Sequence, residues 1–173
     1  MTLGPLMIDL AGLKIEAEEQ ELLQHPLVGG VILFTRNYAD PDQLTALVAA
    51  IHAARNPPLI VAVDHEGGRV QRFRAGVSRL PPLRRIGQDF ELDPRAAATL
   101  ARRLGWLMAA ELRAHGIDLS FAPCVDLDYG VSEVIGDRSF HVRADALAGS
   151  SSTAGNCTWD TMTPGNPLSM RRR

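Results

Sequence analysis

Residues 59–64 read LIVAVD, a short apolar run that is rich in β-branched side chains and ends in an acid. Pro57 and Pro58 precede the run, and the glycine pair Gly67-Gly68 follows it. A run of this length between breakers is typical of a strand that is buried on both faces of a parallel sheet. Asp64 then stands at the carboxyl end of the strand, which is the end where parallel α/β folds bind their ligands.

Three other runs have the same character. Residues 4–10 and 28–34 are predicted to be strands buried on both faces, and the first carries Asp9 near its end. Residues 117–125 are predicted to form a fourth strand, which is weakened by Pro123 because proline cannot donate a ladder hydrogen bond.

Helical patterns separate these runs. Residues 16–24 are rich in helix formers, and Pro26 prevents the helix from continuing. Asp40-Pro41 and Asp93-Pro94 each combine an N-cap acid with a proline suited to the first helical position. The helix that follows Asp93 is predicted to end near His115-Gly116. The apolar stripes of these two helices are Leu44, Leu47, Val48 and Ile51, and Leu100, Leu104, Leu107 and Met108.

The alternation of strands and helices predicts an α/β fold, with parallel strands joined by right-handed crossover helices. Either a doubly wound sheet or a barrel has this pattern. The turn at residues 9–12 offers one glycine where dinucleotide folds need three, which favours the barrel without deciding the matter. A complete (β/α)8 barrel typically needs ~250 residues, so the 173 residues are predicted to hold the N-terminal portion of one.

The amino-acid composition of the chain changes near its C-terminus. Residues 1–148 carry the strand and helix patterns, whereas residues 149–173 are rich in Ser, Thr, Gly and Pro and have no apolar period. A segment of this composition buries too little apolar surface to offset the entropy of ordering, so we expect a disordered tail.

Composition excludes several classes of partner. The net charge is −2 and the sequence pI about 6.2, which provide no basic excess for nucleic acid. The sequence shows neither the pattern of a signal peptide nor an apolar run long enough to cross a bilayer, and this predicts a cytoplasmic protein without a membrane partner. Cys124 and Cys157 are far apart and are expected to be free thiols.

The richest cluster of polar side chains is residues 64–74, DHEGGRVQRFR. Carboxylate and guanidinium groups can hold hydroxyls by charge-assisted hydrogen bonds, and recognition of a polyol is one natural use. The plainer alternative is that Asp64 caps a turn and the arginines are surface charges. A phosphate-binding loop is disfavoured because Arg69-Val70 stands where a nucleotide loop needs lysine and a hydroxyl residue.

A second polar stretch covers residues 126–140. A calcium loop that begins at Asp126 fails, because Val131 stands at the glycine position and Asp137 replaces the closing glutamate. His65, His115 and His141 have no metal-ligand spacing, and no metal or other cofactor is predicted.

Four motifs follow one another along the chain: GVILFTRN at residues 30–37, VAVDHEGGRVQRF at 61–73, SFAP at 120–123 and IGDRSF at 135–140. In this order they resemble the family-3 glycoside hydrolases, and most closely the bacterial cytoplasmic β-N-acetylhexosaminidases of peptidoglycan recycling. The resemblance covers residues 4–147.

The resemblance implies a monomeric barrel enzyme that removes terminal N-acetylglucosamine from peptidoglycan fragments. It implies that Asp64, Arg72 and Arg138 bind the sugar, so that the partner is a small-molecule glycan. The family reaction is retaining: a carboxylate forms a glycosyl-enzyme intermediate, which water releases with acid/base help from a loop histidine.

The residues that perform this chemistry in the family are not recognisable in the sequence. The family has a Lys-His pair and a Gly-His-Gly loop after the motif that contains Arg138, whereas Lys14 is the sole lysine of this chain. No catalytic residue is therefore assigned, and the alternative hypothesis is a catalytically inert fragment with a partial sugar site. A partial barrel leaves sheet edges uncovered, so we expect the fragment to self-associate.

Overall fold

The computed structural model describes residues 3–146, which form two compact units. Within this range the first unit contains residues 3–65, 70–79 and 111–122, and the second contains residues 66–69, 80–110 and 123–146. The predicted tail at 149–173 lies outside the described residues.

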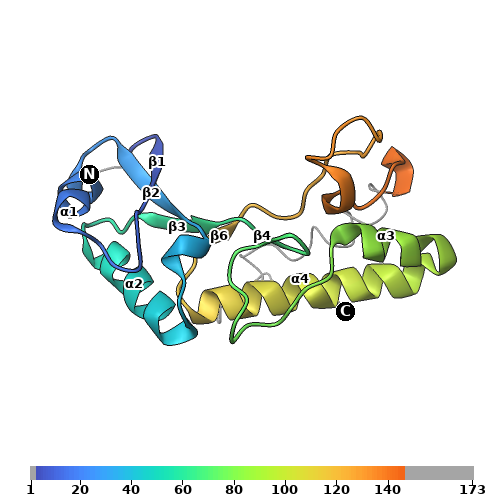
Figure 1. The fold of residues 1–173 in the computed structure, drawn as a ribbon, viewed down its shortest axis with the longest axis horizontal. Helices are drawn as coiled ribbons and strands as arrows, with labels where there is room; N and C mark the ends of the chain where they lie inside the picture. Colours follow the sequence, from blue (N-terminus) through green and yellow to red (C-terminus); the bar gives the residue numbers. More distant parts are fainter. Residues whose placement is uncertain (1–2, 147–173) are drawn as a thin grey trace, which may run out of the picture. The chain divides into compact units, whose positions relative to one another are not determined.

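A four-stranded parallel sheet forms the centre of the first unit (Figure 1). Its strands are β1 (Leu6–Asp9), β2 (Val28–Leu33), β3 (Ile60–Val63) and β6 (Leu119–Ser120), in the order β1-β2-β3-β6. Val31 is in register with both Ile8 and Val61, and Val63 is in register with Ser120. The strand order follows the chain without the reversal that defines a doubly wound sheet. The predicted α/β class with parallel strands is confirmed, and the order is that of a barrel.

Helices α1 (Ala17–Gln24) and α2 (Pro41–Ala53) provide the crossovers between the first three strands. Helix α1 contacts β2 and α2 contacts β3, and both helices lie on the same side of the strands (Figure 1). Asp40 is the predicted N-cap of α2, and its carboxylate accepts a hydrogen bond from the Gln43 amide at 2.8 Å. A short 3-10 helix, η1 (Thr35–Asn37), joins β2 to α2.

The core of the first unit lies between α2 and the middle strands. The predicted stripe of α2 is buried together with Val31, Leu33, Val61 and Val63. The side chains of strand β1 are less buried, since Leu6 is 51% and Met7 39% exposed. The expectation that this strand is buried on both faces is wrong, since β1 forms the edge of the described sheet and has a neighbour on one side alone.

The fourth strand is much shorter than predicted. Pairing with β3 is confined to the region of Leu119 and Ser120, followed by one more hydrogen bond from the Phe121 amide to the Val63 carbonyl at 3.0 Å. The chain then leaves the ladder before Pro123, which has no amide hydrogen to donate.

Between β3 and the next helix, the chain forms the short strands β4 (His65–Gly67) and β5 (Val70–Gln71), where the sequence indicated an irregular loop. Gly67 and Gly68 have φ values of 98° and 55°, a region that side chains rarely adopt. The glycine pair is therefore required by the backbone geometry of this turn.

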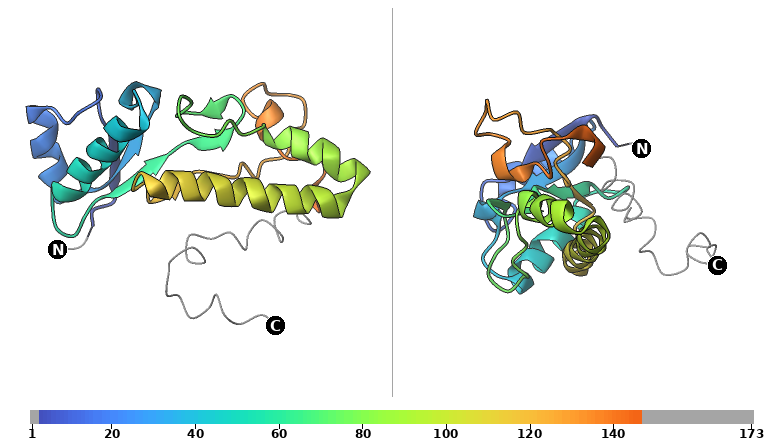
Figure 2. Two further views of the ribbon diagram at one scale, coloured as in Figure 1. Left: turned by 90° about the horizontal axis from the view of Figure 1, so that it is seen from below. Right: turned by 90° about the vertical axis from the view of Figure 1, so that its right-hand side faces the viewer.

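Two helices dominate the second unit. Helix α3 (Leu83–Leu92) was not anticipated, and most of α4 (Pro94–Ala114) lies alongside it (Figure 2). Ile86, Ala97 and Phe140 form the buried cluster between these elements. The Asp93 carboxylate caps α4 by accepting hydrogen bonds from the amides of Arg95 and Ala96, each at 3.0 Å.

The remainder of the second unit is largely irregular chain that includes a 3-10 helix, η2 (Gly136–Arg138). Helix α4 ends as predicted, just before His115-Gly116. None of the helices in the part of the chain that the structure describes is both long and apolar enough to span a bilayer.

Candidate functional site

Asp64 and Arg72 form an ion pair in the first unit, at the carboxyl end of β3. The Arg72 Nη2 lies 3.1 Å from the Asp64 Oδ2, and each side chain is 29% exposed. Burial leaves the Arg72 Nε without a hydrogen-bond partner. The structure therefore brings together two of the three predicted sugar ligands and keeps both accessible to a small polar molecule.

A second ion pair lies beside the first strand. Arg36, from the segment after β2, pairs with Asp9 at the end of β1 and donates from Nε to the Leu10 carbonyl at 2.9 Å. The Arg36 guanidinium lies 4.7 Å from the centroid of the Phe34 ring, and the Arg72 guanidinium lies 5.6 Å from it. Cation–π attraction to one shared ring thus links the two arginines.

These contacts define a polar row at the ends of β1, β2 and β3, made of Asp9, Arg36, Phe34, Arg72 and Asp64. Sequence reasoning did not assign Phe34 or Arg36 to the site. The available signal was the FTR tripeptide directly after the second strand, at the same edge of the sheet as Asp64.

His65 follows Asp64 but faces the interior. Its side chain is buried, its ring lies 5.6 Å from that of Phe73, and its backbone carbonyl accepts a hydrogen bond from the Ser120 hydroxyl at 3.1 Å. Burial lowers the pKa of His65 to about 4, although the charge of Glu111 opposes the shift. The imidazole is therefore neutral at physiological pH.

The third predicted ligand, Arg138, lies in the second unit and pairs with Glu66. Arg138 donates from Nε to Oε2 at 3.0 Å and from Nη2 to Oε1 at 2.7 Å. The Glu66 side chain is 4% exposed, and that of Arg138 is 25% exposed. A bidentate pair of this kind fixes the plane of the guanidinium.

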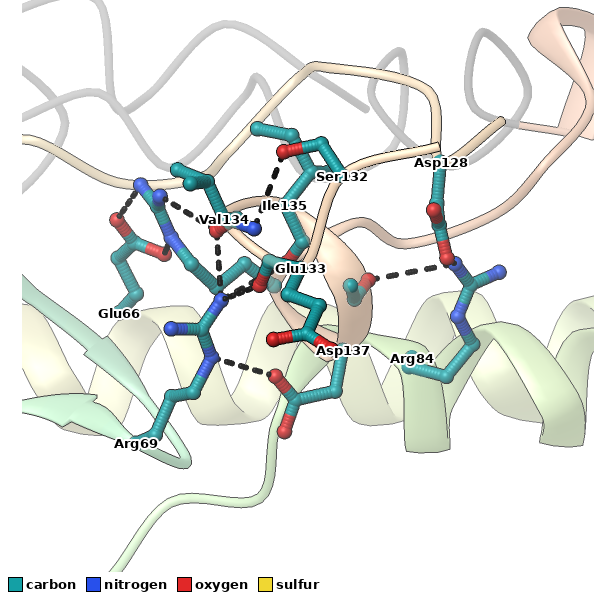
Figure 3. Close-up of polar contacts among 11 residues, drawn as sticks. Glu66, Arg69, Arg84, Asp128, Ser132, Glu133, Val134, Ile135 and Asp137 are labelled. Carbon is teal, nitrogen blue, oxygen red and sulfur yellow. Dashed lines mark hydrogen bonds and ion pairs between the residues drawn. The ribbon is translucent and has the colours of Figure 1, made fainter. Parts of the chain in front are cut away.

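Two further arginines of the second unit hold the segment 128–138, which we call the acidic loop (Figure 3). Arg69 donates to the Asp137 carboxylate at 3.0 Å and to the carbonyl oxygens of Glu133 and Val134 at 2.9 and 2.6 Å. Arg84 donates to the Asp128 carboxylate at 2.7 Å. Arginines thus pair with Asp128 and Asp137, two of the acids that prompted the comparison with a calcium loop.

The charged side chains of each unit offer hydrogen-bonding groups of the kind that hydroxyl compounds use. Asp64 can accept hydrogen bonds, and the exposed part of each arginine can donate them. Glu66 is a poor candidate for proton transfer because both its oxygens accept hydrogen bonds from Arg138. Within residues 3–146, no group of three or more His, Cys, Asp or Glu side chains could hold a metal ion.

A sequential parallel sheet with charged groups at its strand ends defines an α/β protein of the barrel type. Residues 4–153 match the family described as the glycosyl hydrolase family 3 N terminal domain. The chain belongs to this family.

Relatives with high sequence identity are named beta-hexosaminidase. A beta-hexosaminidase from Methylobacillus flagellatus is 60% identical over 147 residues, which are 85% of this chain and 42% of that protein. A beta-hexosaminidase from Thiobacillus denitrificans is 58% identical over 147 residues, which are 85% of this chain and 41% of that protein. The chain thus spans less than half the length of these curated relatives.

Solved structures agree with this assignment. NagZ from Neisseria gonorrhoeae in complex with N-trifluoroacetyl-D-glucosamine is 48% identical and superimposes with a TM-score of 0.86, over 89% of this chain and 45% of that one. A family 3 β-N-acetylglucosaminidase from Paenibacillus is 31% identical with a TM-score of 0.76, over 87% of this chain and 29% of that one.

Proposed function

We propose that this chain supplies the substrate-binding part of a retaining β-N-acetylhexosaminidase that removes terminal N-acetylglucosamine from peptidoglycan fragments. The observation that carries the proposal is the accessible Asp64–Arg72 pair at the end of β3, in a chain whose relatives are named beta-hexosaminidase. The substrate class gains support from a similar protein, NagZ, which was solved with an N-acylated glucosamine analogue.

Three residues are proposed as glycan ligands. Asp64 accepts hydrogen bonds from sugar hydroxyls, and Arg72 and Arg138 donate hydrogen bonds to sugar oxygens. These roles follow from the resemblance at their motifs, and the partial exposure of all three side chains is compatible with them.

The bond-breaking step requires groups other than these. A retaining glycosidase needs a carboxylate nucleophile and an acid/base group. In the described residues, Asp64 and Glu66 are paired with arginines and His65 is buried and neutral. We therefore propose, as the second candidate, that this 173-residue chain on its own binds the sugar without hydrolysing it.

The proposed cellular setting is peptidoglycan recycling in the cytoplasm. This part of the proposal rests on the resemblance to cytoplasmic enzymes of that pathway. Fractionation of cells that express the tagged native gene would test it, because the setting requires the protein in the cytoplasmic fraction and not in the periplasm.

Two measurements on the purified chain test the function. Calorimetric titration with N-acetylglucosamine should give saturable binding, and the Asp64→Asn variant should lose it. Titration with galactose, which lacks the acetamido group, is the control for non-specific binding. Absence of saturable binding to the wild-type chain would contradict a sugar-binding role.

Incubation with 4-nitrophenyl N-acetyl-β-D-glucosaminide tests the second candidate. We expect no nitrophenolate above the buffer rate from this chain. Turnover that disappears in the Asp64→Asn variant would show that the chain is itself an active hexosaminidase and would refute the second candidate.

A further inference from the structure

The Glu66–Arg138 pair differs from the other ion pairs of the acidic loop. Glu66 is almost completely buried, whereas Asp137, the partner of Arg69, is 44% exposed. A buried carboxylate is costly unless charged hydrogen bonds compensate it. Glu66 meets this condition by accepting from two nitrogens of the same guanidinium, at 2.7 and 3.0 Å.

The other two arginines hold the backbone of the acidic loop. Arg69 binds the carbonyl oxygens of Glu133 and Val134, and Arg84 binds that of Gly136 at 3.3 Å (Figure 3). Val131 and Val134 are exposed, so the loop draws little stability from apolar packing and depends on these polar anchors. Arg69 and Arg84 thus anchor the backbone of the loop, whereas Glu66 binds the side chain of Arg138.

Glu66 constrains the rotation of Arg138. Two hydrogen bonds to one carboxylate fix both the plane and the direction of a guanidinium group, whereas a single bond would leave it free to pivot. Arg138 also donates from Nη1 to the Val134 carbonyl at 3.2 Å, which adds a third fixed direction. A quarter of the side chain remains exposed in this fixed orientation.

We propose that Glu66 is a positioning residue, which holds the Arg138 guanidinium in the orientation that binds the N-acetylhexosamine. This inference rests on the proposed function, because it takes Arg138 to be a sugar ligand. Glu66 itself does not touch the sugar: its side chain is buried and both its oxygens are occupied.

The test compares Glu66→Gln with a matched control, Asp128→Asn. Each substitution removes one negative charge from a carboxylate that binds an arginine of the same unit, but Asp128 binds Arg84. An arginine-specific dicarbonyl reagent followed by peptide mass spectrometry reports the accessibility of each arginine separately. Arg138 should react several-fold faster in Glu66→Gln and at the wild-type rate in Asp128→Asn, where Arg84 should react faster.

Titration of the same chains with N-acetylglucosamine provides the functional readout. The dissociation constant should rise about tenfold in Glu66→Gln, as expected when charged hydrogen bonds that orient a ligand group are lost. It should stay at the wild-type value in Asp128→Asn. Equal weakening in both variants would mean that the loop alone matters, and an unchanged Arg138 reactivity or sugar affinity in Glu66→Gln would overturn the inference.

A milder variant addresses the risk of misfolding. Glu66→Asp keeps the charge but shortens the side chain by one methylene, so it should also weaken sugar binding if orientation matters, and wild-type affinity in this variant would refute the positioning role. If the wild-type chain binds no sugar, the proposed function fails. The reactivity of Arg138 still decides whether Glu66 orients it.

Discussion

Asp64 is the residue whose loss should affect binding more than stability. Its ion pair with Arg72 is partly exposed to solvent, and such pairs contribute at most about 1 kcal/mol to stability. Asp64→Asn should therefore lower the free energy of unfolding by less than about 1 kcal/mol and abolish saturable binding of N-acetylglucosamine. Denaturant unfolding alongside calorimetry would check both, and a large loss of stability would contradict the assigned role.

His65 predicts a pH dependence of stability. Its pKa of about 4 in the folded chain is below the ordinary value of 6.5, so the unfolded chain takes up the proton first as the pH falls. The stability due to a neutral His65 is complete above pH 6.5 and is lost as the pH falls from 6.5 to about 4. Once the pH has fallen below about 4, this loss in the free energy of unfolding amounts to about 3 kcal/mol.

The His65→Gln variant would test this, because glutamine does not titrate in that range. Between pH 7 and pH 4.5, the free energy of unfolding should fall more steeply for the wild-type chain than for the variant. Parallel curves for the two proteins would show that His65 does not contribute to acid sensitivity.

Helices α3 and α4 offer a matched pair of glycines. A Cβ added at Gly87 in α3 would overlap the Phe140 carbonyl oxygen, whereas one added at Gly105 in α4 would meet nothing within 4 Å. Gly87→Ala should destabilise the protein by about 2 kcal/mol through overpacking. Gly105→Ala should stabilise it by about 1 kcal/mol, since alanine favours helix. Thermal unfolding of both variants would show whether the signs differ.

The sequence predicted the strands and helices whose signals are local. Asp40 and Asp93 marked helix starts correctly, because a capping acid acts on the amides directly after it. Helix α3 was missed because Pro82 at its N-terminus makes no side-chain cap and Gly87 interrupts its pattern. Contact with Phe140, more than fifty residues away, completes its packing, and no local pattern reports such a contact.

The contacts of the candidate site were visible in the sequence only where they are local. Asp64 and Arg72 are eight residues apart and belong to the same sequence motif, so the sequence alone suggested that they lie close together. The partners of Arg138 and Arg36 are 72 and 27 residues away in the chain, and such pairs depend on how the strands align. Glu66 was visible as part of the motif, but its pairing with Arg138 required the structure.

We propose that the 173-residue chain self-associates. Strand β1 forms one edge of the described sheet, and Leu6 and Met7 on it are exposed. An uncovered edge strand with apolar side chains is prone to pair with another chain. Sedimentation velocity should show a mass that rises with concentration, and Leu6→Lys should reduce it. A monomer at all concentrations would contradict this expectation.

The polar row has a consequence for how the protein is made. Its five residues, from Asp9 to Arg72, all belong to the first 72 residues of the chain. A nascent chain adds residues at about 5–20 per second, so this part can emerge from the ribosome seconds before later segments exist. The charged side chains can therefore find their partners during translation, so two of the three proposed sugar ligands, Asp64 and Arg72, can pair before the rest of the chain is made.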